Sequence, residues 1–403
     1  MSTTTPSLRP AAEAAPFLVW PVGRREFYTA IAVSLVPTLT WGAFIFGFRV
    51  VGLMVAALVG AAATHLLLKR FTTRGRHLVL AHTLLSAAVL TAQSSPLWPA
   101  WVLLVGASLM VLITWAMGGP GAERVHASVL CAVVITAFAS PYIAPSNSLQ
   151  AAFLTRDRLF MGDIRSQSSA PLYAWPVSVN TSGFDAVAST PPAVVAHHML
   201  DRLTMIALDT ADQDPVAGQV AEAITREIDM PLTTQLPPMH LMVLGVAPGQ
   251  IGVVSALGIA LGGLYLAYRN ILRPRSVLLF LAAFLLGSMA MIFNTTFAAQ
   301  GGAPLILRLW QTIPGELGTL LAYSVLNSDA IFAAIVILAL PGTEPLTSRG
   351  RRVFLVVAGL AAAFVHRQTW SIPAATTVLL VMMPIANLFD LAFRKPSWLA
   401  RRA

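Results

Sequence analysis

Long apolar runs recur along the chain, and they set the strongest limit on how it can fold. An α-helix needs roughly 20 mostly apolar residues to cross the hydrocarbon core of a bilayer, and about ten segments of this sequence come close to that length. They lie near residues 27–46, 51–68, 77–93, 99–117, 126–142, 248–267, 276–293, 317–340, 353–366 and 372–391. Lipid offers backbone groups no hydrogen-bond partner, so such segments must be helical. The sequence therefore predicts an all-α polytopic membrane protein with about ten transmembrane helices.

The composition excludes a water-soluble domain. Of the 403 residues 56% are hydrophobic and only 11% are charged, and the mean hydropathy is +0.73, whereas soluble domains carry about 25% charged residues. The net charge of +9 reflects loop charge rather than a nucleic-acid partner, and none is expected. The only cysteine, Cys131, lies in an apolar run, which excludes an internal disulfide, a cysteine zinc site and a thiolate iron–sulfur cluster.

The basic residues gather in alternate loops. If the N-terminus is cytoplasmic, 18 of the 26 Lys and Arg residues lie in the two termini and the inner loops, as the positive-inside rule requires. The long segment 143–246 carries ten acidic and five basic residues, and long loops cross a membrane regardless of charge. We therefore expect a multi-pass protein of the bacterial inner (plasma) membrane, with both termini in the cytoplasm.

The spans divide into two equal sets around the long outer loop. We predict a cytoplasmic tail at 1–26, a first membrane half at 27–142, an extracytoplasmic loop at 143–246, a second half at 247–392 and a cytoplasmic tail at 393–403. Five spans precede the loop and five follow it from the opposite side. This arrangement predicts an inverted repeat of five plus five helices, as in many transport folds.

Spans three and eight carry polar interruptions at matching positions. Span three ends in Gln93-Ser94-Ser95-Pro96, and span eight contains Asn327-Ser328-Asp329. Broken helices are tolerated in a bilayer only where they face protein or a cavity, which favours a central site between the halves. Asp329 is an ion or proton site in one interpretation, since an ionisable group within a span is a functional hypothesis. In the other interpretation it caps the second half-helix.

No metal site is expected. His65 and His82 lie within spans two and three, with no second His or carboxylate three or four residues away, and are interpreted as packing residues. His197, His198 and His240 fall in or beside the outer loop without the fixed spacing of ligands.

Several motifs occur in the order and spacing of one membrane-protein family. They are Leu-Thr-Ala-Gln-Ser-Ser-Pro at 90–96, Gly-Gly-Pro-Gly at 118–121 and Leu-Ala-Leu-Pro-Gly-Thr-Glu-Pro-Leu-Thr-Ser-Arg-Gly-Arg at 338–351. The wider similarity covers 80–141, 257–275 and 326–396. On these motifs the chain resembles the D subunit of the Rnf electron-transport complex (RnfD) and the B subunit of the sodium-pumping NADH:quinone reductase (NqrB).

The resemblance implies a subunit that passes electrons through flavin, coupled to sodium or proton movement, beside other membrane subunits and a periplasmic flavoprotein. It implies FMN attached through its phosphate to a Thr of an Asp-x-x-Ser-x-Ala-Thr motif in the loop that joins the halves. Two stretches of this chain approach the motif. Asp163 to Ser169 would make Ser169 the acceptor, and Asp185 to Pro191 would make it Thr190. Both are also ordinary residues for a Ser/Pro-rich connector.

The sequence departs from the family in span eight. Relatives carry a Ser-Gly-Ala-Thr turn and an Asp-Pro pair there, whereas this chain has Asn327-Ser328-Asp329-Ala330 and then Leu340-Pro341. Asp329 either replaces the missing acid or belongs to a changed path. Two alternative functions remain open on the same fold: a flavin-free membrane transporter, and an accessory membrane protein of a biosynthetic gene cluster.

Overall fold

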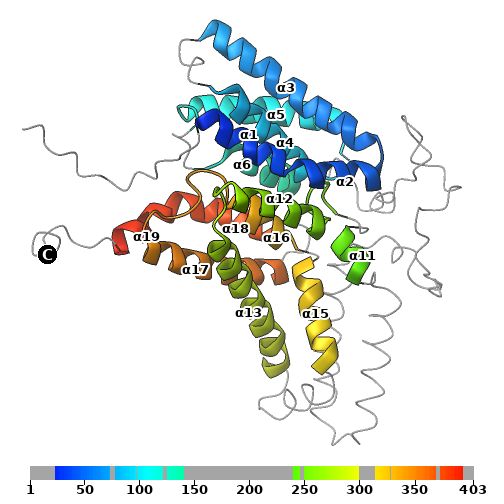
Figure 1. The fold of residues 1–403 in the computed structure, drawn as a ribbon, viewed down its shortest axis with the longest axis vertical. Coiled ribbons are helices and arrows are strands. Elements are labelled where there is room, and N and C mark those ends of the chain that lie inside the picture. The colour runs from blue at the N-terminus through cyan, green and yellow to red at the C-terminus, as the bar shows by residue number, and fades with distance from the viewer. Residues whose placement is uncertain are drawn as a thin grey trace, which may run out of the picture.

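The computed structural model describes residues 23–72, 78–96, 98–120, 125–139, 239–245, 249–298, 314–326, 328–368 and 373–393. The regular elements within these stretches are helices, and no strand occurs in them. The predicted all-α character is therefore confirmed for this part of the chain (Figure 1). Most of the predicted loop 143–246 lies outside the described residues.

The first half contains six α-helices and one π-helical segment among its described residues. They are α1 (Arg24–Ser34), α2 (Val36–Phe46), α3 (Arg49–Phe71), α4 (Leu80–Ala92), α5 (Ala100–Ala116), α6 (Ala127–Val134) and η2 (Ile135–Ala139). These elements coincide with the five apolar runs predicted before the loop.

The second half is more fragmented. Its described elements are α11 (Met239–Leu244), α12 (Ala256–Tyr268), α13 (Pro274–Ala298), α15 (Pro314–Leu326), α16 (Ala330–Phe332), η6 (Ala333–Ile337), α17 (Ser348–Gln368), α18 (Ala374–Met382), η7 (Met383–Ile385) and α19 (Ala386–Phe393). Figure 1 shows the first-half helices together in blue to cyan, with the second half in green to red beside them and α12 along the boundary.

Span three, which the sequence predicts to be broken, is the continuous helix α4 as far as Ala92. Two other spans are broken at prolines. The helix of span one is interrupted at Leu35, between α1 and α2, because Pro37 has no N–H to donate to the carbonyl of Val33 and its ring crowds the preceding turn. Pro384 lies in η7, a short 3-10 segment between α18 and α19. Hydrophobic length alone does not reveal these breaks.

Within the described residues, four helices are long and apolar enough to cross a membrane: Arg25–Phe46, Arg49–Phe71, Pro274–Met291 and Ala374–Phe393. Four shorter apolar helices accompany them, at Leu80–Ala92, Ala100–Ala116, Ala127–Ala137 and Ala256–Tyr268. The structure thus supports a multi-pass membrane protein. The count of ten spans and the inverted repeat stay predictions.

The most extensive packing joins two pairs of long helices at the periphery, α3 with α5 and α13 with α17. Each pair approaches through a glycine. A Cβ added at Gly60 would collide with the carbonyl oxygen of Leu104, and one at Gly359 would lie 2.6 Å from that of Phe280. Small residues allow such close backbone contact between membrane helices.

The other faces of these four helices carry large apolar side chains that the described part of the chain leaves exposed. They include Val55, Val59 and Leu66 on α3, Leu104 and Leu109 on α5, Leu278 and Leu286 on α13, and Val357 and Phe364 on α17. Exposed apolar surface of this extent is typical of a face that contacts lipid.

The two halves meet at their central helices. In the first half α4 is surrounded by α1, α3, α5 and α6, and α12 of the second half packs against α1 and α2. The N–H groups of Ile251 and Gly252 donate to the carbonyls of Ser94 (3.0 Å) and Ala92 (2.8 Å). The end of α4 is therefore completed by backbone from the second half.

Candidate functional site

Asp329 lies at the interruption of span eight, where α15 ends at Leu326 and α16 begins at Ala330. Its side chain is buried and accepts two backbone hydrogen bonds, from the N–H of Ala375 to Oδ1 (2.9 Å) and from the N–H of Thr376 to Oδ2 (2.7 Å). Both donors belong to the first turn of α18. Asp329 makes no side-chain capping bond to its own helix α16. It therefore caps a helix more than 40 residues away.

This contact joins three favourable effects. A carboxylate at a helix N-terminus satisfies N–H groups that have no partner within the helix, its bonds are charge-assisted, and the helix dipole favours negative charge there. Each carboxylate oxygen keeps a further lone pair beyond these bonds. The side chain can thus hold α18 and still offer oxygen to a cation or a proton, so its role as an ion site stays a prediction.

The residues around Asp329 are polar and buried. Ser328 is buried, and its hydroxyl donates to the carbonyl of Val325 (3.0 Å) and accepts from the N–H of Ala330 (3.3 Å). The hydroxyl oxygen of Thr376 is buried without a hydrogen-bond partner among the described residues. Helix α18 also packs against α6 of the first half, so this polar centre lies beside the contact between the halves.

A second buried polar cluster lies in the first half. Nδ1 of His65 lies 3.0 Å from the hydroxyl of Thr83, in agreement with the packing role predicted for this histidine. The His82 ring stands edge-on to Tyr28 (centroids 5.0 Å apart) and lies 5.3 Å from the ring of His126. No group of three His, Cys, Asp or Glu side chains in the described stretches is placed to hold a metal ion.

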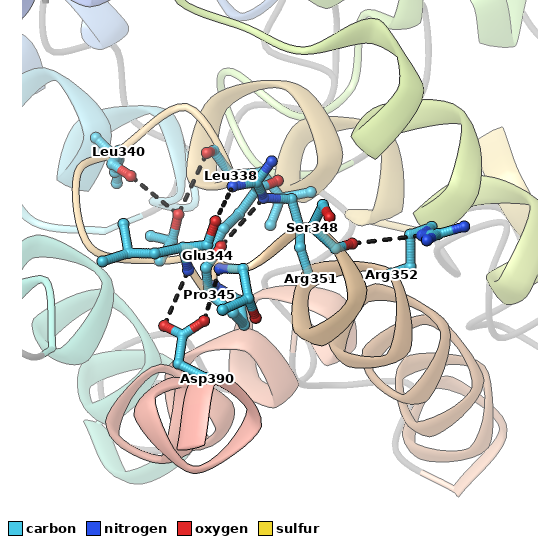
Figure 2. Close-up of polar contacts among 11 residues, drawn as sticks. Leu338, Leu340, Glu344, Pro345, Ser348, Arg351, Arg352 and Asp390 are labelled. Atoms are coloured by element: carbon cyan, nitrogen blue, oxygen red, sulfur yellow. Dashed lines mark hydrogen bonds and ion pairs between the residues drawn. The ribbon is translucent and has the colours of Figure 1, made fainter. Parts of the chain in front are cut away.

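A third polar site is the turn that joins η6 to α17. Asp390 of α19 accepts the N–H groups of Leu346 at Oδ2 (2.9 Å) and Thr347 at Oδ1 (2.7 Å), as Figure 2 shows. The guanidinium of Arg351 lies 3.0 Å from the Glu344 carboxylate and donates to the carbonyls of Pro345 and Leu346, both at 3.1 Å. These bonds hold the turn against the start of α17.

Burial raises the pKa of Glu344 to about 7, while a hydrogen bond from Ser276 and the charge of Arg273 act in the opposite direction. The carboxyl group therefore titrates near neutral pH within a cluster of basic residues. In the predicted topology this cluster faces the cytoplasm.

Sequence reasoning missed two of these participants. Asp390 is a single acid in the apolar run 372–391, and the criterion applied to Asp329, an ionisable group within a span, would have identified it. His126 follows a polar loop and begins span five, so only its contact with His82 reveals its place. Ser169 and Thr190, the two predicted flavin acceptors, lie outside the described residues, as do His197 and His198.

Comparison with known proteins gives two matches. The family model described as "NQR2, RnfD, RnfE family" matches residues 12–397. A protein of Halorhodospira halophila, named as the D subunit of an ion-translocating oxidoreductase complex, is 25% identical over 363 residues, which cover 88% of this chain and 85% of that relative.

Proposed function

Because the chain belongs to the NQR2, RnfD, RnfE family, we propose that it is an integral membrane subunit of an Rnf-type ion-translocating oxidoreductase complex. The observation that carries the proposal is the family match over residues 12–397, which includes both membrane halves and the segment between them. The name of the relative from H. halophila points to the same kind of complex. In this role the subunit passes electrons via flavin, with coupled ion translocation.

The partners follow from that role. They are other membrane subunits of the complex and a periplasmic flavoprotein, and the location is the bacterial inner membrane with both termini in the cytoplasm. The lipid-facing side chains of α3, α5, α13 and α17 support a bilayer-embedded subunit. The two matched helix pairs, α3 with α5 and α13 with α17, support an inverted repeat of five plus five spans.

The flavin is an FMN held through its phosphate by Ser169 or Thr190. Both side chains carry the hydroxyl that a phosphoester bond requires, and a bound flavin would supply electron-transfer chemistry. The two residues lie in the same predicted outer loop, so either position would place the group on the same side of the membrane.

The test is in-gel fluorescence of the denatured protein after co-expression with a flavin transferase. We expect a fluorescent band from the unchanged chain. One of the two variants, Ser169→Ala or Thr190→Ala, should lose the band, and the other should keep it. Ser178→Ala, in the same predicted loop but outside both candidate stretches, is the matched control. A chain that carries no fluorescence under these conditions would contradict covalent FMN and favour a flavin-free role.

One observation favours a second candidate function, a flavin-free transporter. The interrupted eighth span places a buried carboxylate, Asp329, beside the contact between the halves, as broken helices do at transport sites. An accessory role in a biosynthetic gene cluster would use the same fold. Neighbouring genes discriminate, because further Rnf subunits favour electron transfer and biosynthetic enzymes favour the accessory role.

A further inference from the structure

One face of α4 carries a row of buried polar side chains. His82, Ser86 and Gln93 are separated by four and seven residues, which places them within about 40° of one another around a helix axis. All three are nearly inaccessible, at 2%, 1% and 1% exposure. The row spans about 16 Å along the helix, a large part of the thickness of a bilayer.

Several polar atoms on or beside this row have no hydrogen-bond partner within the described part of the chain. They are the hydroxyl oxygen of Ser86, both amide atoms of Gln93, and Nε2 of His126, whose ring lies beside His82. Other polar side chains of α4 are paired. The Thr83 hydroxyl contacts His65, and the hydroxyl of Thr91, on the opposite face, donates to the carbonyl of Ala87 (2.9 Å). Of the polar side chains on α4 and at its C-cap, those with unpaired atoms thus lie on one face of the helix.

Unpaired polar atoms in a protein interior are rare, because each loses its bonds to water without replacement. When several lie together, internal water molecules bonded to two or more of them are the usual explanation. We propose that a file of water molecules lies along this face of α4 and that, with the His82–His126 pair, it conducts protons. The role of this file in ion translocation rests on the proposed function, whereas the presence of water does not.

The charges around the file favour a proton over a metal cation. The buried titratable side chains on the surrounding helices are Tyr28 of α1, His65 of α3, and His126 and Cys131 at and within α6. The charged residues of α1 and α3 are confined to their ends, and α5 has none. With no buried carboxylate among the described residues of these helices, a cation lacks the oxygen ligands it prefers. Imidazole nitrogens and water exchange protons readily.

The file ends at the contact between the halves. The backbone carbonyls next to Gln93, those of Ala92 and Ser94, accept hydrogen bonds from Gly252 and Ile251. The neighbouring Gln250 contributes another buried oxygen without a partner among the described residues, Oε1. The path therefore runs from the histidine pair to the point where the second half begins.

The presence of water is tested by removing single polar groups. If water bonds to these groups, Ser86→Ala and Gln93→Leu each lower the thermal midpoint of the purified protein by about 2 °C or more, and by more than Thr91→Val. Thr91→Val is the matched control, because that hydroxyl donates to a carbonyl of its own helix, that of Ala87. If the face is dry, the same two changes remove an unpaired polar group and leave the midpoint unchanged or raise it. That result overturns the proposal.

Proton conduction is tested on the assembled complex in sealed inverted vesicles, by the ratio of protons moved to electrons transferred. We expect Gln93→Leu to lower this ratio at least twofold while electron transfer continues, and Thr91→Val to leave it unchanged. An unchanged ratio in Gln93→Leu, or wild-type vesicles that move sodium and no protons, overturns proton conduction. Wild-type vesicles that move no ion contradict the proposed function instead, and the thermal midpoints still decide whether the file exists.

Discussion

The two halves of the membrane domain share their periphery and differ at their centre. Each half holds a pair of long helices, α3 with α5 or α13 with α17, at a glycine contact and presents apolar side chains outward. Their central elements are unlike. In the first half α4 is an unbroken helix with one buried histidine, His82. The stretch that the predicted inverted repeat would align with it is divided into α15, α16 and η6 around a buried carboxylate. We infer that contact with lipid keeps the outward side chains apolar in both halves, whereas the polar side chains at the two centres differ.

The largest effect is expected where the second half departs from the first, at Asp329. Replacing Asp329 with Ala leaves the N–H groups of Ala375 and Thr376 buried without acceptors, which should lower the free energy of unfolding by about 3 kcal/mol. Asp329→Asn keeps one acceptor oxygen and should cost about half as much. Thermal unfolding in detergent measures both.

Ion flux in proteoliposomes separates the two interpretations of Asp329. Flux abolished in Asp329→Asn while the folded protein remains favours an ion or proton site. Unchanged flux would mean that the side chain only caps α18. The polar residues at the centre of the second half would then stabilise the fold without binding an ion.

The shared periphery is tested by filling its glycine contacts. Gly60→Val and Gly359→Val should each destabilise by about 2 to 3 kcal/mol, because the added side chain meets the backbone of the neighbouring helix. Gly52→Ala on α3 is the control, since nothing lies within 4 Å of an added Cβ, and it should be neutral or slightly stabilising. Unequal costs at Gly60 and Gly359 would show that the two pairs are not equivalent.

One pH dependence of unfolding should come from Glu344 in the second half. Burial raises the pKa of Glu344 from 4.5 to about 7, so between these values the folded state binds more protons than the unfolded state. The contribution of Glu344 to stability is then fully present below pH 4.5 and falls as the pH rises to 7, by on the order of 3 kcal/mol. Glu344→Gln should remove this part of the dependence of unfolding on pH. A profile that Glu344→Gln leaves unchanged would contradict the raised pKa.

The smallest effect concerns the start of the second helix in each pair, α5 or α17. Helix α17 is preceded by a turn that Asp390 holds from α19, whereas α5 begins after Pro99 with no side-chain cap. Asp390→Asn should therefore cost about 1 kcal/mol in unfolding experiments. Asn387→Ala, in the same helix, is the control and should have a smaller effect.

The sequence predicts the helical elements well because lipid imposes one simple condition, an apolar run of fixed length. It predicts less well where a helix is interrupted within a span. Breaks at Pro37 and Pro384 do not alter hydrophobic length, and the eighth-span interruption is recognisable only because Asn327, Ser328 and Asp329 are polar.

The sequence predicts which residue matters at the candidate site, but it does not predict which groups that residue contacts. Asp329 stands out as an acid within a span, but its donors belong to α18, 46 and 47 residues further along the chain. Local capping rules consider only neighbouring residues, so they point to α16, where no such bond forms. The contact of His82 with His126 is likewise invisible until α4 and α6 are packed together.

The backbone bonds that complete α4 have a consequence for biogenesis. The carbonyls of Ala92 and Ser94 find their donors in Gly252 and Ile251, which the ribosome delivers only after the whole intervening segment. At about 5–20 residues per second, the third span waits on the order of ten seconds or more for these partners. During this interval the newly made first half has no partner for the carbonyls at the end of α4. A chaperone or a neighbouring subunit then has access to that helix end.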